Sequence, residues 1–259
     1  MDTSESLLKA ERQTWIRRLV DRQGRVTVIE VSSQLGVSEA TIRRDLEEMD
    51  DRGWIHRTHG GAVRVDRATR EPPINLRLKD HPQEKKKIGK AGAQLLKDGE
   101  TVFFGSSTTV LEIARNIPDD LHLKVITNSL SIVNELSGHR HIEMIVIGGM
   151  FRHSELAMVG YFAEQMVQDF RADKVFIGIR AIDITHGFTN DDLQDSILDR
   201  IILKIAPKII IGADHTKFGR VSTVLVGPLT AAHVIITDQF TPIEIVEELR
   251  QIGIDVILA

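Results

Sequence analysis

VSEATIRRDL, residues 37–46, has the composition expected for the start of a helix with one apolar side. Ser38 is a favourable N-cap, because its hydroxyl can accept a hydrogen bond from a backbone N–H of the first turn. Ile42, Leu46 and Met49 recur at helical spacing and predict one buried stripe. The stretch therefore predicts a helix that buries this stripe and exposes its other side.

The outward side of this helix has a composition that suits DNA. Short polar side chains near a helix N-terminus can enter the major groove, and guanidinium groups can bind guanine edges or phosphates. A solvated helix face is the alternative interpretation. The residues that we expect to contact DNA are Ser38, Glu39, Thr41, Arg43 and Arg44.

Two further helices are predicted before this one. Residues 8–22 have apolar side chains at near-helical spacing, and Gly24 follows them. Thr27 and Glu30 have the spacing of a capping box, which opens a short helix that Gly36 ends. Two short helices joined by a turn that contains glycine predict a helix-turn-helix.

Residues 54–63 predict a small β-hairpin, because alternating side chains lead into Gly60-Gly61. Such a hairpin after a helix-turn-helix is a wing that lies along the DNA backbone or in the minor groove. The wing residues assigned to DNA are His56, Arg57, His59 and Gly60. A metal pair or plain turn residues are the alternatives for the two histidines. With no third ligand nearby in sequence, we expect no metal and no cofactor.

Composition separates the chain into two parts. Residues 1–70 hold 13 Lys and Arg against 12 Asp and Glu, whereas the rest holds 20 against 25. Both Trp residues lie before residue 60 and all nine Phe lie beyond residue 100. We predict a DNA-binding domain at 1–63, a linker rich in proline at 64–83 and a second domain at 84–259. There is no cysteine, no signal-like N-terminus and no run of membrane-spanning length, so a cytoplasmic protein without a membrane partner is expected.

The second domain alternates apolar β-branched runs with helical patterns. Runs without polar alternation indicate strands covered on both faces, and hence a mostly parallel α/β sheet. A helix is expected from Glu84 to Leu96; its lysine run is typical of a solvated face, with a role beside an anion as the weaker alternative. Strands are expected near 101–104, 124–127, 142–147, 174–178, 208–212, 233–237 and 255–258, and helices over 108–116, 129–137, 161–170, 195–206 and 242–251.

Polar residues gather where these strands end, which is where ligands of parallel α/β folds bind. Gly105 to Thr109 follows the first strand and opens a helix, so hydroxyls, backbone N–H groups and the helix dipole converge on one anion-sized spot. A phosphate is the expected occupant, and N-capping alone is the alternative. Thr127 to Ser129 and Gly148 to Arg152 bring further donors to the same edge, as a sugar phosphate requires.

At these residues the chain resembles the DeoR-type bacterial repressors. The resemblance rests on SEATIRRDL at 38–46, HRTHGGAV at 56–63, EKKKI at 84–88, STT at 107–109, TNSL at 127–130, GGMFR at 148–152, VG at 159–160, DKVFIG at 173–178 and ADHTKFG at 213–219. It implies a winged helix-turn-helix joined to a sensor resembling ribose-5-phosphate isomerase. It further implies a transcriptional regulator of carbohydrate metabolism, a phosphorylated sugar effector, double-stranded operator DNA and a homo-oligomer, dimer or tetramer.

With the polar strand ends added, the resemblance implies an effector site at Ser106, Ser107, Thr108, Thr109, Asn128, Ser129, Gly149, Arg152, Arg180, Asp183, Asp214 and Lys217. The chain departs from the family pattern at three places. Gly105 stands where an Asp is usual, Arg180-Ala181 where a small residue and Gly are usual, and Asp199 where a Lys is common. The alternative function is a sugar-phosphate isomerase with a fused nucleic-acid-binding module, in which Asp183, Asp214 and Lys217 supply the acid–base groups.

Overall fold

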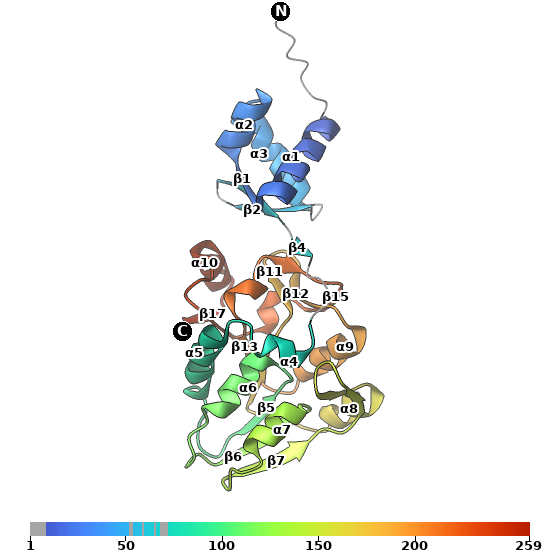
Figure 1. Cartoon of the computed structure of the whole chain (residues 1–259), viewed down its shortest axis with the longest axis vertical. Helices are drawn as coiled ribbons and strands as arrows, with labels where there is room; N and C mark the ends of the chain where they lie inside the picture. Colours follow the sequence, from blue (N-terminus) through green and yellow to red (C-terminus); the bar gives the residue numbers. More distant parts are fainter. Residues whose placement is uncertain (1–8, 52–53, 59, 65, 68–71) are drawn as a thin grey trace, which may run out of the picture. The chain divides into compact units, whose positions relative to one another are not determined.

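The computed structural model describes residues 9–51, 54–58, 60–64, 66–67 and 72–259 (Figure 1). The chain forms two compact units, Met1–Asp66 and Arg67–Ala259. Each unit has buried apolar clusters of its own. The finer limits of 1–63, 64–83 and 84–259 stay predictions.

In the described part of the N-terminal unit, three helices pack on a three-stranded antiparallel sheet. The helices are α1 (Lys9–Gln23), α2 (Val28–Leu35) and α3 (Glu39–Asp51), and the strands are β1 (Arg25–Thr27), β2 (Ile55–Thr58) and β3 (Gly61–Arg64), in the order β1-β3-β2. The predicted stripe of Ile42, Leu46 and Met49 is fully buried against α1 and the sheet. The helix-turn-helix and its wing are confirmed, and β1 adds a strand that was not predicted.

Local interactions fix the start and the end of α2 and the start of α3. The Glu30 backbone N–H donates to Thr27 Oγ1 at 3.1 Å, which confirms the predicted cap of α2. Gly36 ends that helix in the left-handed conformation, with φ of 63°, where glycine carries no steric penalty. The Thr41 backbone N–H donates to Ser38 Oγ at 3.3 Å, so Ser38 caps α3 as predicted.

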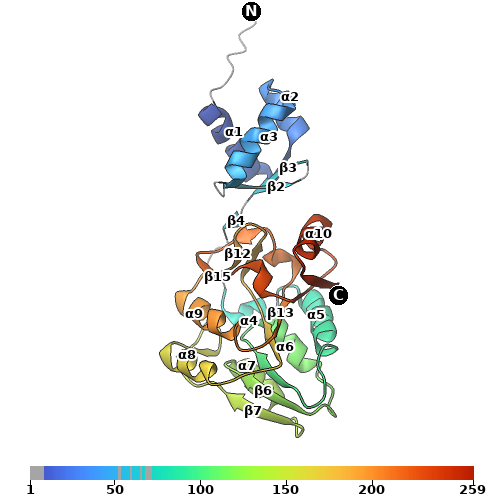
Figure 2. The ribbon, with the colours of Figure 1, turned by 180° about the vertical axis from the view of Figure 1, so that it is seen from behind.

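The C-terminal unit is built on a parallel sheet of seven strands among the described residues (Figures 1 and 2). The strands are β5 (Thr101–Phe104), β6 (Leu123–Thr127), β7 (Ile142–Val146), β10 (Lys174–Ile177), β13 (Lys208–Gly212), β16 (Val234–Thr237) and β17 (Asp255–Leu258). Their order is β17-β16-β13-β10-β5-β6-β7, and every pairing is parallel. All seven predicted strands are confirmed; the central strands β5, β10, β13 and β16 are largely buried, whereas the edge strands β7 and β17 are partly exposed.

Helices cover both faces of this sheet. Neighbouring residues of one strand face opposite sides, so Phe103 lies in one apolar cluster and Phe104 in the other. The Phe104 cluster contains side chains from α5 (Pro82–Ala93), α6 (Thr108–Arg115) and α7 (Leu130–Leu136). The Phe103 cluster contains side chains from α8 (Tyr161–Gln168), α9 (Leu193–Ile202) and α10 (Ile243–Gln251).

Several short elements were not predicted, because two to four residues give too little periodicity. They are β4 (Asp66–Arg67), α4 (Ile74–Arg77), the hairpin of β8 (Met150–Arg152) and β9 (Ala157–Val159), the small sheet of β11 (Ala181–Asp183), β12 (Gly187–Asn190) and β15 (Val224–Gly227), β14 (Arg220–Val221), and the 3₁₀ turns η1 (His215–Lys217) and η2 (Leu229–Ala231). Helix α4 lies within the predicted linker. The Ile74 N–H donates to the Ser154 carbonyl at 2.7 Å, so this segment packs on the C-terminal unit.

Candidate functional site

The first candidate surface is the exposed side of α3. Ser38, Glu39, Arg43 and Arg44 are exposed, and Thr41 is partly exposed, as expected for residues that would contact DNA. Glu39 Oε2 accepts a hydrogen bond from the Arg43 guanidinium at 3.0 Å, one helical turn away. That pair holds Arg43 along the helix surface, where an i,i+4 ion pair contributes only a few tenths of a kcal/mol.

An internal ion pair orients α3 within the unit. Asp45 is buried on the inner side of α3, and its carboxylate accepts from the Arg12 guanidinium of α1, with one contact at 3.2 Å. The hydrogen bond to Asp45 raises the pKa of Arg12, so this guanidinium stays charged. Because α1 and α3 are fixed to each other, the exposed residues of α3 form a rigid surface.

The wing residues are described only in part. Arg57 lies 3.4 Å from Glu47 of α3, and the carbonyl of exposed Gly60 accepts from the Val28 N–H at 2.8 Å. The backbone of His56 pairs with Val63, and His59 lies outside the described residues. A Cβ on Gly61 would lie 1.9 Å from the Val26 carbonyl oxygen, so only glycine lets β3 approach β1 this closely.

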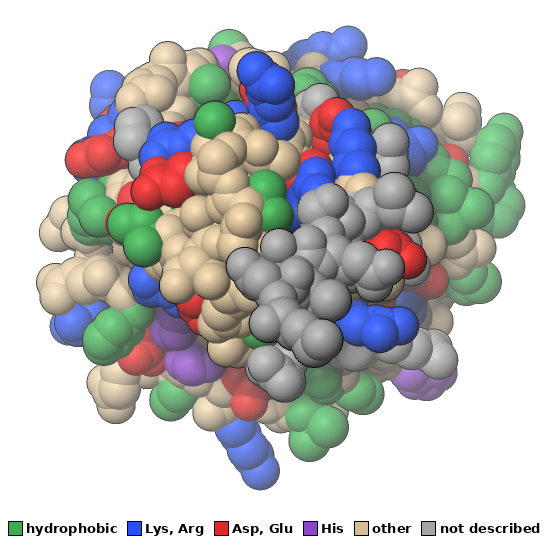
Figure 3. Space-filling view, turned by 90° about the horizontal axis from the view of Figure 1, so that it is seen from above, with side chains coloured by type: hydrophobic (Ala, Val, Ile, Leu, Met, Phe, Trp, Pro, Cys, Tyr) green, Lys and Arg blue, Asp and Glu red, His purple; other side chains and the backbone are tan. Residues whose placement is uncertain are grey.

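Basic and acidic side chains alternate on the protein surface. Figure 3 shows Lys and Arg side chains beside Asp and Glu side chains on the face seen from above. A uniform basic patch would give mainly nonspecific affinity for phosphates. Individual arginines at defined positions on a helix are instead suited to hydrogen bonds with base edges.

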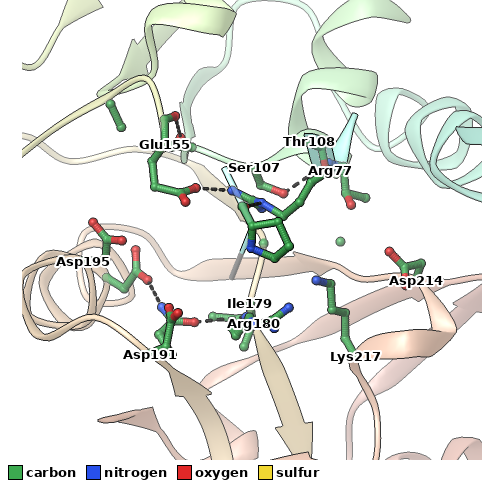
Figure 4. A pocket seen from close by; sticks show the side chains of 18 of the residues that line it. Arg77, Ser107, Thr108, Glu155, Ile179, Arg180, Asp191, Asp195, Asp214 and Lys217 are labelled. Atoms are coloured by element: carbon green, nitrogen blue, oxygen red, sulfur yellow. Dashed lines mark hydrogen bonds and ion pairs between the residues drawn. The ribbon is translucent and has the colours of Figure 1, made fainter. Parts of the chain in front are cut away.

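The second candidate site is a cavity of about 330 Å³ in the C-terminal unit (Figure 4). It opens at the carboxyl ends of β5, β6, β10 and β13, as predicted, and α4, α5, β9 and α9 contribute further residues. Pockets for small metabolites begin at about this size. Eight predicted effector residues line it together: Ser106, Ser107, Thr108, Thr109, Asn128, Arg180, Asp214 and Lys217.

The N-terminus of α6 forms one wall of the cavity. Ser107 caps the helix by accepting from the N–H groups of Thr109 and Val110, at 3.2 and 3.5 Å. Ser106 donates to the Glu155 carbonyl at 2.9 Å and ties this wall to the segment before β9. Ser107 therefore acts as the N-cap, as in the alternative interpretation, while Thr108 lines the cavity.

Cations and Asp214 form the side of the cavity opposite Thr108. Lys85 is buried and donates to the carbonyl oxygens of Arg77 and Asp80, at 2.6 and 2.7 Å. Burial lowers the pKa of Lys85, and Asp214 opposes that effect. Burial would raise the pKa of Asp214, but its hydrogen bond from Thr216 and the charges of Lys217 and Lys85 together lower it. An anion here would meet ammonium groups already oriented by the fold.

Four predicted effector residues do not line this cavity. Ser129 caps α7, and Gly149, at φ of 157°, has the Val159 carbonyl oxygen 2.7 Å from where a Cβ would lie. Asp183 Oδ1 accepts from the N–H groups of Thr185 and His186 and thereby holds a turn. Arg152 pairs with Asp192 and lies 3.5 Å from Asp195. Arg152 thereby positions Asp195, which lines the cavity, without lining it itself.

Sequence reasoning missed much of the lining. The polar residues missed are Arg77, Asp80, His81, Lys85, Glu155, Asn190, Asp191, Asp195, Asp199, Thr216 and Arg220. Lys85 was assigned to a solvated run, with a role beside an anion as the weaker alternative, and its neighbours Lys86 and Lys87 are indeed exposed. The usable signal was that Lys85 precedes Ile88 by three positions and so shares the apolar stripe of α5.

Comparisons with known proteins decide the family. Residues 12–68 match the DeoR-like helix-turn-helix domain, and residues 80–239 match the DeoR C terminal sensor domain. The chain belongs to the DeoR family. The HTH-type transcriptional regulator GlpR of Haloferax volcanii is 35% identical over 97% of this chain and 98% of its own length. The HTH-type transcriptional repressor CsqR of Escherichia coli is 31% identical over 93% and 92%.

Solved structures resemble the chain only distantly. Ribose 5-phosphate isomerase A from Methanocaldococcus jannaschii has a TM-score of 0.40 and 15% identity over 54% of this chain, which spans 55% of that protein. The translation initiation factor eIF-2B of Pyrococcus horikoshii has a TM-score of 0.44 and 16% identity, over 90% of this chain and 82% of its own. Because the DeoR relatives are transcriptional regulators, the regulator prediction is confirmed and the isomerase alternative is set aside.

Among the residues that the structure describes, no group of three or more His, Asp or Glu is placed to hold a metal ion. In the same part of the chain, no helix is long and apolar enough to cross a bilayer.

Proposed function

We propose that the chain represses a carbohydrate-metabolism operon by binding operator DNA through α3 and the β2–β3 wing, and that a phosphorylated sugar in the cavity controls this binding. The observation that carries the effector proposal is the meeting of the α6 N-terminus with Lys85 and Lys217 around one cavity. Helix N-termini and ammonium groups both favour phosphate oxygens. The remaining hydroxyl, amide and carboxylate groups suit sugar hydroxyls.

Control of DNA binding requires that the cavity reach the chain leading to the DNA-binding unit. Residues 72–85 provide that connection, because Pro72, Arg77 and Lys85 line the cavity and precede the sensor core in sequence. Arg77 forms an ion pair with Glu155 across the cavity and donates a hydrogen bond to the Pro72 carbonyl at 2.9 Å. A ligand that changes these bonds shifts the equilibrium between arrangements of this segment.

We further propose a homo-oligomer, a dimer or tetramer, that binds paired operator half-sites. In support, both edge strands of the sheet carry apolar side chains in solvent, with Val146 of β7 42% exposed and Leu258 of β17 41% exposed. An edge strand with apolar residues is a ready surface for pairing between copies.

Thermal unfolding with a panel of sugar phosphates tests the effector proposal. A ligand at a hundred times its dissociation constant stabilises the folded state by about 2.7 kcal/mol. The compound that stabilises the protein should also change its affinity for DNA selected from a random pool. The variant Lys217→Gln should lose that stabilisation, whereas the exposed-site control Lys86→Gln should keep it. Stabilisation that survives Lys217→Gln would contradict the assignment of this cavity.

A further inference from the structure

The cavity has two chemically different ends. In Figure 4, Lys217 lies on one side together with Asp214, while Glu155, Asp191 and Asp195 lie on the other. Asp199 of α9 also lines the cavity, one helical turn after Asp195. A ligand that places its phosphate near Lys217 and Thr108 therefore meets carboxylates with its remaining groups.

The side chain of Asp199 is held in place from one side. Its Oδ2 accepts a hydrogen bond from Asn190 Nδ2 at 2.6 Å. The Asn190 amide is itself fixed, because its Oδ1 accepts from the Arg180 N–H at 3.0 Å. Asn190 is the single hydrogen-bond partner of Asp199 among the described residues, so Asp199 Oδ1 remains for a ligand.

The surroundings of Asp199 favour a positive charge. Arg77 pairs with Glu155, Arg152 lies 3.5 Å from Asp195, and the buried Arg180 also lines the cavity. Burial first, and then the charges of Asp195 and Glu155, raise its pKa well above the ordinary value, against the opposing hydrogen bond from Asn190. A ligand hydroxyl leaves that repulsion in place, whereas an ammonium group relieves it.

Asn128 adds an independent requirement for a donor on the ligand. It lines the cavity, is 5% exposed, and donates through Nδ2 to the Met158 carbonyl at 3.0 Å. That bond fixes the amide orientation, because the carbonyl can only accept. Its Oδ1 is buried and, within the described part of the chain, has no hydrogen-bond partner. A buried acceptor left in this state costs about 1–3 kcal/mol, which a donor on the ligand recovers.

We infer that the effector is a phosphorylated amino sugar, with its protonated amine against Asp199 and its phosphate against Lys217 and the N-terminus of α6. This inference rests on the proposed function, since it assumes that the cavity binds a sugar phosphate. It makes Asp199 the residue that distinguishes an amine from a hydroxyl.

Matched ligand pairs test the inference by calorimetry on the full chain. Glucosamine 6-phosphate and glucose 6-phosphate differ only in an amine for a hydroxyl, as do galactosamine 6-phosphate and galactose 6-phosphate. In at least one pair the amine should bind about tenfold more tightly, the size of a charged hydrogen bond. Binding of the amine should also release protons from Asp199, which appears as a buffer-dependent enthalpy.

The variant Asp199→Asn should remove this preference by bringing the affinity of the amine compound down to that of the hydroxyl compound, and the exposed control Asp169→Asn should keep the preference. Equal affinities within both pairs, or an Asp199→Asn variant that still prefers the amine, would overturn the inference and leave the proposed function standing. If no sugar phosphate binds at all, the proposed function fails together with the inference.

Discussion

Gly178 stands directly after β10, against the N-cap of α6, and lines the cavity. A Cβ at this position would lie 2.2 Å from Ser107 Oγ and 2.6 Å from Ser107 Cβ. Both separations are far below contact distance, so Gly178→Ala must displace the Ser107 side chain. Displacement breaks the hydrogen bonds that Ser107 accepts from Thr109 and Val110 at the start of α6.

The expected loss of stability has two parts. Losing a serine N-cap costs about 1 kcal/mol. Forcing a methyl group into a packed site costs about 1–3 kcal/mol more. We therefore expect Gly178→Ala to lower the unfolding free energy of the C-terminal unit by about 2–4 kcal/mol and to weaken binding of glucose 6-phosphate, since Thr108 moves with the helix start.

Urea unfolding followed by far-UV circular dichroism measures the first effect, and calorimetry measures the second. Trp15 and Trp54 belong to the N-terminal unit, so their fluorescence follows that unit separately. The matched control is Gly138→Ala, where an added Cβ meets nothing within 4 Å; a change within about 0.5 kcal/mol is expected there. Equal unfolding free energies for both variants would refute the argument from close approach.

Three further changes test other parts of the molecule. Arg44→Ala should weaken binding to selected double-stranded DNA by about 1–3 kcal/mol if the guanidinium binds a base edge; anisotropy at fixed salt measures this, and an affinity equal to that of the exposed control Arg140→Ala would exclude Arg44 from the interface. Thr108→Ala should weaken glucose 6-phosphate binding in calorimetry without changing DNA affinity, and a loss of both would indicate a folding defect instead. Asp199→Asn should raise the melting temperature near pH 8, because a raised carboxyl pKa means that stability falls as the pH rises through it. That gain should shrink as the pH falls below about 3, under the ordinary Asp pKa of about 3.9, because the carboxyl is then protonated in both folded and unfolded chains; a gain independent of pH would contradict the assigned cause.

The fold could be predicted because its main elements carry strong periodic signals. The central strands β10, β13 and β16 are runs such as Lys208–Gly212 whose interior residues are buried on both faces. Such runs are hydrophobic without alternation, and in the helices between them the apolar residues recur with a period of 3.6 residues. In the N-terminal unit the capping residues Thr27 and Ser38 marked helix starts correctly, because capping depends on neighbours in sequence alone.

The site could be predicted only where it follows directly from a strand end. Residues 106–109 and Asn128 meet at the cavity because parallel strands end at one edge. Arg77 and Glu155 lie 78 positions apart and come together through α4 and the segment before β9, which have no periodic signal. Asp183 was assigned to the cavity, yet its carboxylate turns to the nearby N–H groups of residues 185 and 186. The Asp183 carboxylate thus forms local hydrogen bonds with the backbone in place of the expected contact with a ligand.

In the proposed mechanism, Lys85 connects ligand binding with the segment leading to the DNA-binding unit. Its ammonium group is shared between the carbonyl oxygens of Arg77 and Asp80 and the charge of Asp214. These bonds hold the corner between α4 and α5, where His81 adopts a left-handed conformation with φ of 48° that non-glycine residues rarely take. A phosphate that draws Lys85 toward the cavity competes with its hydrogen bonds to both carbonyl oxygens. These two hydrogen bonds help to offset the backbone strain at His81. Binding energy gained at the phosphate is then coupled to the geometry of residues 74–81, which is the physical requirement for a sensor that acts through its linker.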